Sequence, residues 1–156
     1  MENEFTVATV GTIKVTPHSV NVIPGTCTFS LEIRDQSAEV MKLIENHLRQ
    51  LLEDICKKYG VTSTFVPTSY HDPAPMSELV RGTIEEAVKE LGIDYTVIPS
   101  GAFHDSLIMT SVFPTGMIFV PSKDGISHSR YEYTAPEDIE NGCNVLLNTV
   151  LKLDEK

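Results

Sequence analysis

The sequence predicts two structural parts, an antiparallel α+β layer over residues 1–72 and an α/β unit over residues 73–156. Apolar residues alternate with a period of two in the first part, as in a sheet buried on one face. Helix and strand patterns alternate in the second part, which is typical of a mainly parallel sheet covered by helices. The prolines within residues 71–75 suit a linker between the two parts.

The first part begins with two expected strands, joined by a long loop over residues 17–25. In the first strand, alternate positions share one face: Phe5, Val7, Thr9, Gly11, Ile13 and Val15. In the second strand, the apolar positions share a face in the same way: Cys27, Phe29, Leu31 and Ile33. The positions between them are polar and include Glu32 and Arg34. The layer should therefore have one apolar face and one open, polar face.

A helix is expected next, with Ser37 as its N-cap and Gly60 at its end. Its apolar stripe contains Val40, Ile44, Leu48, Leu51, Leu52 and Ile55. A strand over residues 61–66 should then complete the first part.

The second part should start with a helix from Ser77 to Gly92, because a capping residue precedes an apolar stripe and a glycine closes it. A strand over residues 93–98 and a short helix over residues 105–113 should follow. Residues 117–120 form a continuous apolar run, as expected of a strand buried on both faces.

The last helix is marked by its N-terminus, where Thr134 and Glu137 suggest a capping box and Pro136 falls in the first turn. The order of the second part is therefore helix, strand, helix, strand, helix. In open parallel sheets, ligands bind at the carboxyl ends of the strands.

Composition excludes several classes of function. The formal net charge is -10, so the phosphate backbone of a nucleic acid would be repelled. No apolar run approaches the roughly 20 residues that cross a bilayer, and residues 1–10 do not resemble a signal peptide. The cysteines, Cys27, Cys56 and Cys143, are too widely spaced for a disulfide framework or a Cys-x-x-Cys metal pair. We expect a cytoplasmic protein with buried, reduced thiols that binds neither nucleic acid nor membrane.

Two loops follow the expected strands of the second part. Residues 99–105 follow the first strand and contain His104, and residues 121–132 follow the second and contain His128. If the strands are neighbours, both histidines lie on the rim where ligands bind.

A loop histidine can be a metal ligand, a general acid or base, or a structural group, and the last is the commonest. His128 is a stronger candidate, because Glu132 is close enough in sequence to orient a metal-bound imidazole. Asp105 could orient His104 or equally cap the next helix. A triad of Ser100, His104 and Asp105 is disfavoured, because residues so close in sequence rarely reach one another in triad order and no nucleophile elbow is present.

Residues 21–25 (Asn-Val-Ile-Pro-Gly) and 29–35 (Phe-Ser-Leu-Glu-Ile-Arg-Asp) resemble the lid-domain signature of the dinuclear-zinc aminoacylase and carboxypeptidase superfamily. The resemblance implies that Asn21 and Arg34 hold the substrate's carboxylate in the partner subunit's active site. A guanidinium on the polar face of a strand suits such binding. From the residues alone, a solvated strand-end arginine and a turn asparagine would be the simpler interpretations.

A narrower branch is indicated by residues 117–122, residues 125–129 and Glu132. They resemble the N-carbamoyl-L-amino acid hydrolases, allantoate amidohydrolases and β-ureidopropionases. Residues 100–106 resemble the Gly-Ala-Gly-His-Asp loop of this branch, except that Phe103 replaces a glycine. Arg130 also departs from the branch, which commonly has a proline at that position.

The resemblance implies roles for single residues of the second part. His128 matches the family's last metal-ligand histidine. The substrate would contact the loop that contains Gly101, Ala102 and His104. Glu132 and Asp105 would be the carboxylates that support the two histidines from behind.

The implied fold is a partial lid or dimerisation domain over residues 1–72 and the C-terminal part of a catalytic domain over residues 73–156. The implied reaction is hydrolysis of a linear amide or ureido C–N bond in a small carboxylate, such as an N-carbamoyl amino acid or allantoate. Two divalent metals, zinc or manganese, would activate the water in the intact site. The lid would form a homodimer.

The family's other metal ligands and its general-base glutamate belong to an N-terminal region that this sequence does not contain. One histidine cannot hold two metals, so the chain is expected to be inactive alone and to be a fragment, a truncated product or one half of a split enzyme. One alternative is a non-catalytic dimerisation or carboxylate-binding remnant of the fold. Another is an N-acyl amino acid deacylase or dipeptidase of the same superfamily.

Overall fold

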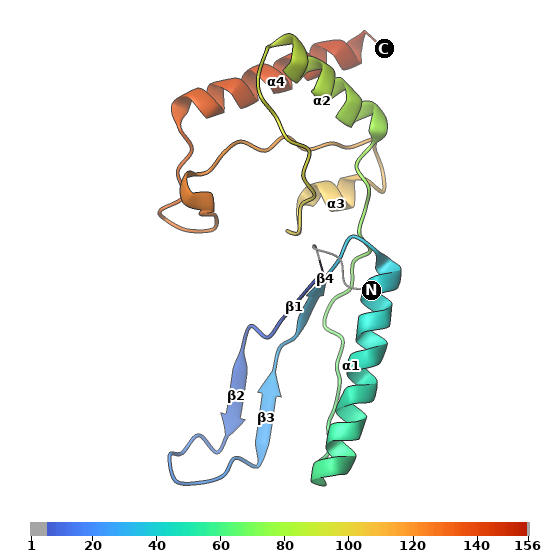
Figure 1. Cartoon of the computed structure of the whole chain (residues 1–156), viewed down its shortest axis with the longest axis vertical. Coiled ribbons are helices and arrows are strands. Elements are labelled where there is room, and N and C mark those ends of the chain that lie inside the picture. The colour runs from blue at the N-terminus through green and yellow to red at the C-terminus, as the bar shows by residue number, and fades with distance from the viewer. Residues whose placement is uncertain (1–5, 156) are drawn as a thin grey trace. The chain divides into compact units, whose positions relative to one another are not determined.

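The computed structural model describes residues 6–155 (Figure 1). Its contacts divide the chain into two compact units, Met1–Pro73 and Ala74–Lys156, which we describe separately. Within residues 6–155, no helix is both long enough and apolar enough to span a bilayer.

Two short antiparallel ladders make up the strands of the first unit. β1 (Val7–Thr9) pairs with β4 (Glu32–Arg34), and β2 (Ile13–Thr16) pairs with β3 (Thr26–Phe29). Each of the two predicted strands is therefore divided into two shorter ones, as the blue arrows of Figure 1 show. Phe5, expected at the start of the first strand, lies outside the described residues.

The break between the ladders is a bulge of one residue. Thr9 is opposite Glu32 and Ile13 is opposite Phe29, so three residues of one strand face two of the other. Ser30 bridges the break: its backbone N–H donates to the Thr12 carbonyl (3.1 Å), and its hydroxyl accepts from the Thr12 N–H (3.1 Å).

The bulge makes the predicted apolar face of the first strand wrong. Residues directly opposite each other in a ladder share a face. Ile13 is opposite Phe29 as expected, but Val7 is opposite Arg34, and Ala8 is the residue that faces Ile33. One extra residue in a strand moves the side chains beyond it to the opposite face of the sheet.

α1 (Ala38–Tyr59) has the predicted ends. The Ser37 hydroxyl accepts from the Val40 N–H, and Gly60 adopts the left-handed conformation (φ 66°) while its N–H donates to the Cys56 carbonyl. The predicted strand over residues 61–66 is not formed, because no strand of the described chain pairs with it. Instead, the Arg49 guanidinium lies 3.8 Å from the centre of the Phe65 ring.

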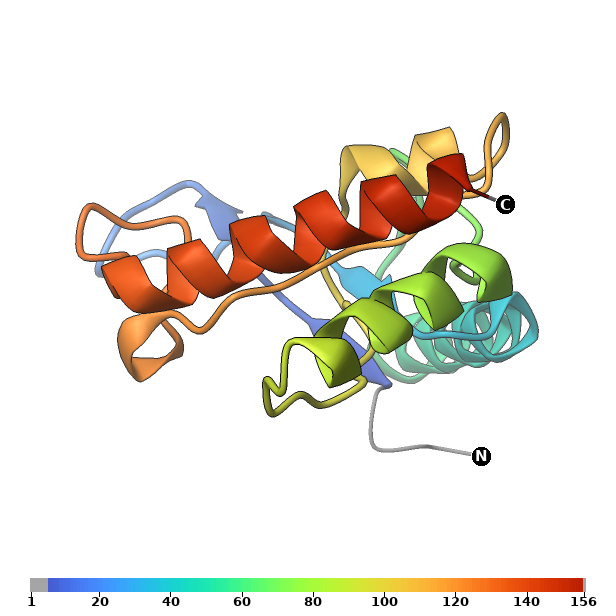
Figure 2. The ribbon, with the colours of Figure 1, turned by 90° about the horizontal axis from the view of Figure 1, so that it is seen from above.

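The core of the second unit lies between α2 (Glu78–Glu90) and α4 (Pro136–Asp154), which pack against each other (Figure 2). The described residues that are buried all belong to these two helices: Thr83, Ala87, Val88, Val145 and Thr149. The two buried hydroxyls each donate to a carbonyl one turn earlier, so they are satisfied.

The helix ends of the second unit agree in part with the predictions. Gly92 follows α2 with φ 66°, and its N–H donates to the Lys89 carbonyl. α4 begins at Pro136 as predicted, but its N-cap is Ala135 and no side chain caps it, so the capping box of Thr134 with Glu137 is wrong. α3 (Asp105–Met109) is shorter than predicted, and the 3-10 helix η1 (Lys123–Gly125) was not predicted.

The two predicted strands of the second unit are not formed. Residues 93–98 and 117–120 run without a ladder, because no described segment lies hydrogen-bonded beside them. The parallel sheet is therefore absent from residues 74–155.

The segment beneath the helices is nevertheless in the place that a covered strand would take. A Cβ on Gly116 would lie 2.7 Å from Val80 of α2, and a Cβ on Gly142 of α4 would lie 2.5 Å from Val120. Residues 116–120 thus pass against both helices, and a glycine permits the close approach at each contact.

The cysteines form no disulfide among residues 6–155, as expected, but their predicted burial is wrong. Cys27 and Cys143 are exposed and Cys56 is half-buried. Cys27 lies in β3, whose apolar face no other element covers completely.

Candidate functional site

The loop that contains His128 is closed by its own hydrogen bonds. At its base the Lys123 N–H donates to the Tyr133 carbonyl (2.8 Å), and inside it the Ser122 hydroxyl donates to the Ile126 carbonyl (2.6 Å). The left-handed backbone at Asp124 (φ 57°) makes the first turn of the loop. The Asp-Gly pair at residues 124–125 is typical of turns and could have predicted this one.

His128 itself has a left-handed backbone (φ 56°), which a non-glycine residue adopts at a cost of about 1–2 kcal/mol. Such strain persists where the surroundings impose it, and it is concentrated at functional sites. Here the Glu132 carboxylate accepts a hydrogen bond from the His128 N–H (3.0 Å). The sequence pattern did not reveal this strained backbone.

The role predicted for Glu132 is therefore different in the structure. It was expected to orient the imidazole ring of His128, but it binds the main chain instead. The His128 side chain is exposed, and its ring has no hydrogen-bond partner within residues 6–155. Glu132 thus fixes the loop that presents His128 and leaves the ring free.

The metal chemistry implied for His128 needs more ligands than the described chain supplies. A catalytic zinc takes about three protein ligands. Residues 6–155 contain no group of three or more His, Cys, Asp or Glu side chains that could hold a metal ion. The residues present therefore do not fit a two-metal centre on their own.

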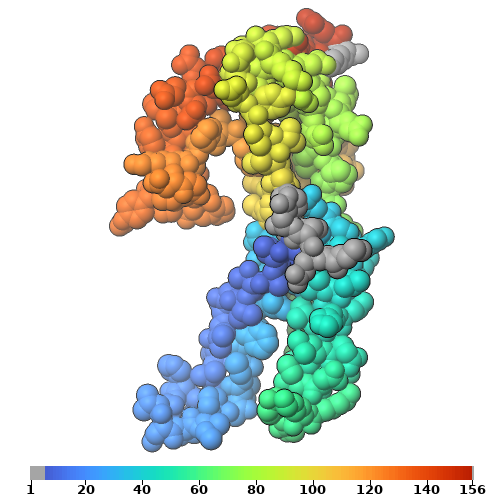
Figure 3. Space-filling model, in the orientation of Figure 1, coloured from blue at the N-terminus to red at the C-terminus, as the bar shows by residue number. Residues whose placement is uncertain are grey.

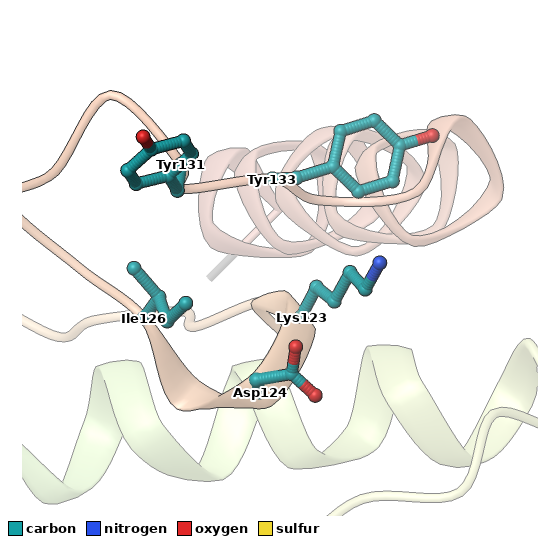
Figure 4. A pocket seen from close by; sticks show the side chains of 5 residues that line it. All are labelled: Lys123, Asp124, Ile126, Tyr131 and Tyr133. Carbon is teal, nitrogen blue, oxygen red and sulfur yellow. The ribbon is translucent and has the colours of Figure 1, made fainter.

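A shallow hollow lies on the same loop. Figure 4 shows Tyr131 and Tyr133 on one side of it, with Ile126, Lys123 and Asp124 on the other. Both tyrosine side chains are largely exposed, at 63% and 55%. The hollow therefore offers aromatic faces and a cation beside the loop's strained segment.

The second loop holds one of the two contacts that the disfavoured triad would need. The Ser100 hydroxyl oxygen lies 2.8 Å from His104 Nε2, although only four residues separate them. Asp105 does not complete a triad, because it begins α3 and makes no hydrogen bond to the His104 ring.

His104 and Ser106 contact residues 117–120, the apolar run that was predicted as the second strand. The His104 and Phe119 rings are 5.7 Å apart, tilted by 58°, and the Ser106 hydroxyl donates to the sulfur of Met117 (2.9 Å). Gly101 and Ala102 are exposed beside His104, and Phe103 is 56% exposed and does not fill the loop.

The two histidine loops are not packed together. Figure 3 shows open space between the orange loop, residues 121–133, and the yellow segment that leads into residues 99–105. That both histidines share one site stays a prediction.

Asn21 and Arg34 lie at opposite ends of the hairpin. Asn21 is in loop 17–25, beyond the paired ends of β2 and β3, where it accepts from the Ser19 hydroxyl (2.7 Å). Arg34 is in β4, roughly 25 Å farther along the strand direction. Its guanidinium contacts both oxygens of Glu32 at 2.9 Å. These two residues of one chain therefore do not lie close enough to share one carboxylate.

The chain matches the model of peptidase family M20/M25/M40 over residues 3–152. It is 40% identical over 148 residues to an N-carbamoyl-L-amino acid amidohydrolase of Geobacillus stearothermophilus, covering 95% of this chain and 36% of that protein. It is 34% identical over 145 residues to the allantoate amidohydrolase of Bacillus subtilis, covering 93% and 35%.

Solved structures agree with these relatives. The crystal structure of a hydantoinase/carbamoylase family amidase from Burkholderia multivorans is similar with a TM-score of 0.90 and 36% identity. The match covers 97% of this chain and 37% of that one. The chain thus spans about a third of the length of the curated relatives it matches.

Proposed function

The chain belongs to peptidase family M20/M25/M40, and we propose that it forms the C-terminal part of an amidohydrolase that cleaves amide or ureido C–N bonds of small carboxylates. The observation that carries the proposal is the family match over residues 3–152, combined with the strained His128 at the matching loop. Relatives named for N-carbamoyl amino acids and for allantoate support the substrate class.

The residues suggest how the substrate would be held. His104 is a neutral or cationic donor on a loop with exposed backbone at Gly101 and Ala102. To take a carboxylate, Arg34 would have to exchange its ion pair with Glu32, which is exposed and therefore inexpensive to break. Because Asn21 lies far from Arg34, the two would contact different substrate molecules or different sites.

Two divalent metals, zinc or manganese, are proposed for the whole enzyme, and they would supply an activated water. His128 would be one ligand. The other ligands would come from protein outside this chain, since residues 6–155 contain no further ligand group. The chain alone should therefore neither retain two metals nor turn over substrate.

We also propose that residues 1–72 pair with a second copy. The chain exposes 12473 Å². A compact protein of this mass would expose about 7,800 Å², and two separate compact halves about 9,400 Å². The excess counts the surface of both units, and the first unit contributes to it because none of its described residues is buried. A second copy would cover part of that surface. Sedimentation should find dimers, and a monomer at high concentration would contradict this part of the proposal.

The test uses the chain alone and co-expressed with the segment of the Geobacillus stearothermophilus relative that precedes its matched region. The pair should bind metal and hydrolyse an N-carbamoyl amino acid, and the chain alone should do neither. His128→Ala should lose metal and turnover in the pair. His18→Ala, an exposed histidine of loop 17–25, is the matched control. Metal-dependent turnover by the purified chain alone would show that the proposal is wrong.

A non-catalytic remnant is the second candidate, and Phe103 and Arg130, which replace residues of the branch pattern, favour it. In that case the co-expressed pair would associate but would hold no metal and hydrolyse neither substrate.

A further inference from the structure

The Ser100 hydroxyl stands between two partners in the loop before α3. Its oxygen accepts a hydrogen bond from the Ala102 N–H (3.3 Å) and lies 2.8 Å from His104 Nε2. Both Ser100 and His104 are half-buried, so water competes less for this contact than it would on an open surface. The Phe119 ring, 5.7 Å from the imidazole, restricts the ring's rotation from the side.

The donors and acceptors of this group determine where its protons lie. A hydroxyl has one hydrogen to donate, and a neutral imidazole has one N–H and one bare nitrogen. The Ala102 N–H already occupies one lone pair of Ser100, so donation by the hydroxyl to Nε2 uses its groups more fully than a second accepted hydrogen bond would. The ring nitrogen of His104 is the acceptor within reach for the Ser100 hydrogen, and Nδ1 has no partner within residues 6–155.

We propose that Ser100 is a positioning residue that fixes neutral His104 as the Nδ1–H tautomer, so that the ring offers a hydrogen-bond donor to the substrate. A free neutral imidazole prefers to carry its proton on Nε2. The hydrogen bond from Ser100 reverses that preference, because Nε2 must be bare to accept it.

The consequence for recognition rests on the proposed function. A neutral N–H donor suits a carbonyl or carboxylate oxygen of the substrate and does not bind a substrate's own N–H. His104 would therefore favour the oxygen of a ureido, amide or carboxylate group over its nitrogen. The Ser100–His104 contact is present before any ligand binds, so no substrate binding energy is needed to form it.

The same pair could instead be a nucleophile and its base. That chemistry needs a base oriented in turn by a third group. Asp105 follows His104 directly but makes no hydrogen bond to its ring, and within residues 6–155 no residue other than Ser100 does so. The geometry therefore favours positioning of His104 over activation of Ser100.

Nitrogen-15 NMR of the imidazole side chains tests this on the 156-residue chain without metal or substrate. At a pH where the ring is neutral, His104 should show a protonated Nδ1 and a bare Nε2. Ser100→Ala should shift the ring toward the Nε2–H form, and Ser100→Thr, which keeps the hydroxyl, should restore the original pattern. Ser106→Ala is the matched control, because that hydroxyl contacts Met117 and not His104. His104→Gln identifies the signal.

A protonated Nε2 in the unaltered chain, or no change in Ser100→Ala, would overturn the inference. Neither outcome depends on turnover, so this result is distinct from failure of the proposed function. In a co-expressed pair with activity, Ser100→Ala should raise the Michaelis constant more than it lowers kcat, whereas Ser106→Ala should change neither.

Discussion

The two units bury their side chains to very different degrees. Residues 74–155 enclose five buried side chains between α2 and α4, whereas no described residue of the first unit is buried. Each unit nevertheless has a helix that ends at a predicted glycine, Gly60 after α1 and Gly92 after α2. Local signals can therefore specify helix ends, but strands and a core also need a second surface facing the first.

The difference has a physical cause in each unit. α2 and α4 lie against each other and against residues 116–120, so three segments share one interior. In the first unit, the short ladders form one layer and α1 forms the other. Ile13 and Phe29 remain 68% and 51% exposed. The hydrogen bonds of the first unit are thus left close to water, where they stabilise little.

The largest expected effect is a difference in hydrogen exchange between the units. Amides in the middle of α2 and α4 should exchange at least about 100-fold more slowly than those of β1 to β4, because opening the helices exposes the buried side chains. Exchange followed by mass spectrometry on the isolated chain measures this directly. Equal protection in both units would show that the first unit has gained a covering surface, and a dilution series would then reveal whether a second copy supplies it.

A smaller effect is expected from two glycines in the helices of the core. Gly142→Ala in α4 should destabilise the second unit by about 1–3 kcal/mol, because the new methyl would lie 2.5 Å from Val120. Gly82→Ala in α2 is the control, since a Cβ there meets nothing within 4 Å and should stabilise by about 0.5–1 kcal/mol through helix propensity. Urea unfolding followed by circular dichroism compares the two.

If Gly142→Ala stabilised the second unit and Gly82→Ala destabilised it, residues 116–120 would not lie against α4. A destabilised Gly82→Ala would contradict the open surroundings of Gly82, because that side of α2 would then have to be covered.

The sequence predicted helices better than strands for reasons visible in particular residues. Ser37, Gly60 and Gly92 act on their own neighbours, so their effects can be read locally. A strand over residues 117–120 would need a hydrogen-bonded neighbour, and no described segment pairs with these residues. Their apolar pattern could not predict whether such a neighbour is present. The bulge at Thr12 was also not predicted, because the alternation of residues in the sequence continues across it while the strand pairing shifts by one residue.

The candidate site shows the same limit. The family pattern placed His128 and His104 on two loops, but the pattern could not tell which neighbour each would contact. Glu132 binds the His128 main chain, and Ser100 binds the His104 ring. Both contacts depend on backbone turns, including the left-handed one at His128, that side-chain types alone do not specify.

Capping provides a third, smaller contrast between the units. Ser37→Ala should destabilise α1 by about 0.5–1 kcal/mol, because its hydroxyl accepts from the Val40 N–H at 3.4 Å. Ser77→Ala is the matched control in the second unit, since Ser77 precedes α2 without a side-chain capping bond. Helix content from circular dichroism at increasing urea should fall earlier for Ser37→Ala. An equal loss in both variants would mean that the two serines act through something other than capping.

The smallest expected effect concerns the tether of residues 93–98 to α2, the part of the second unit that lacks a ladder. The Tyr95 hydroxyl donates to the Glu85 carboxylate, and Lys89 contacts the same carboxylate at 2.9 Å. The hydrogen bond from Tyr95 and then the contact with Lys89 hold the pKa of Glu85 below its usual value. A carboxyl with a lowered pKa adds stability above its unfolded pKa, and that stability is lost as the pH falls through the folded value.

Tyr95→Phe should therefore raise the pKa of Glu85 toward 4.5, as measured by NMR titration of its side-chain carboxyl. Tyr131→Phe, another exposed tyrosine, should leave that pKa unchanged. If Tyr95→Phe also leaves it unchanged, residues 93–98 are not held to α2 in solution, and the second unit is then as open on this side as the first.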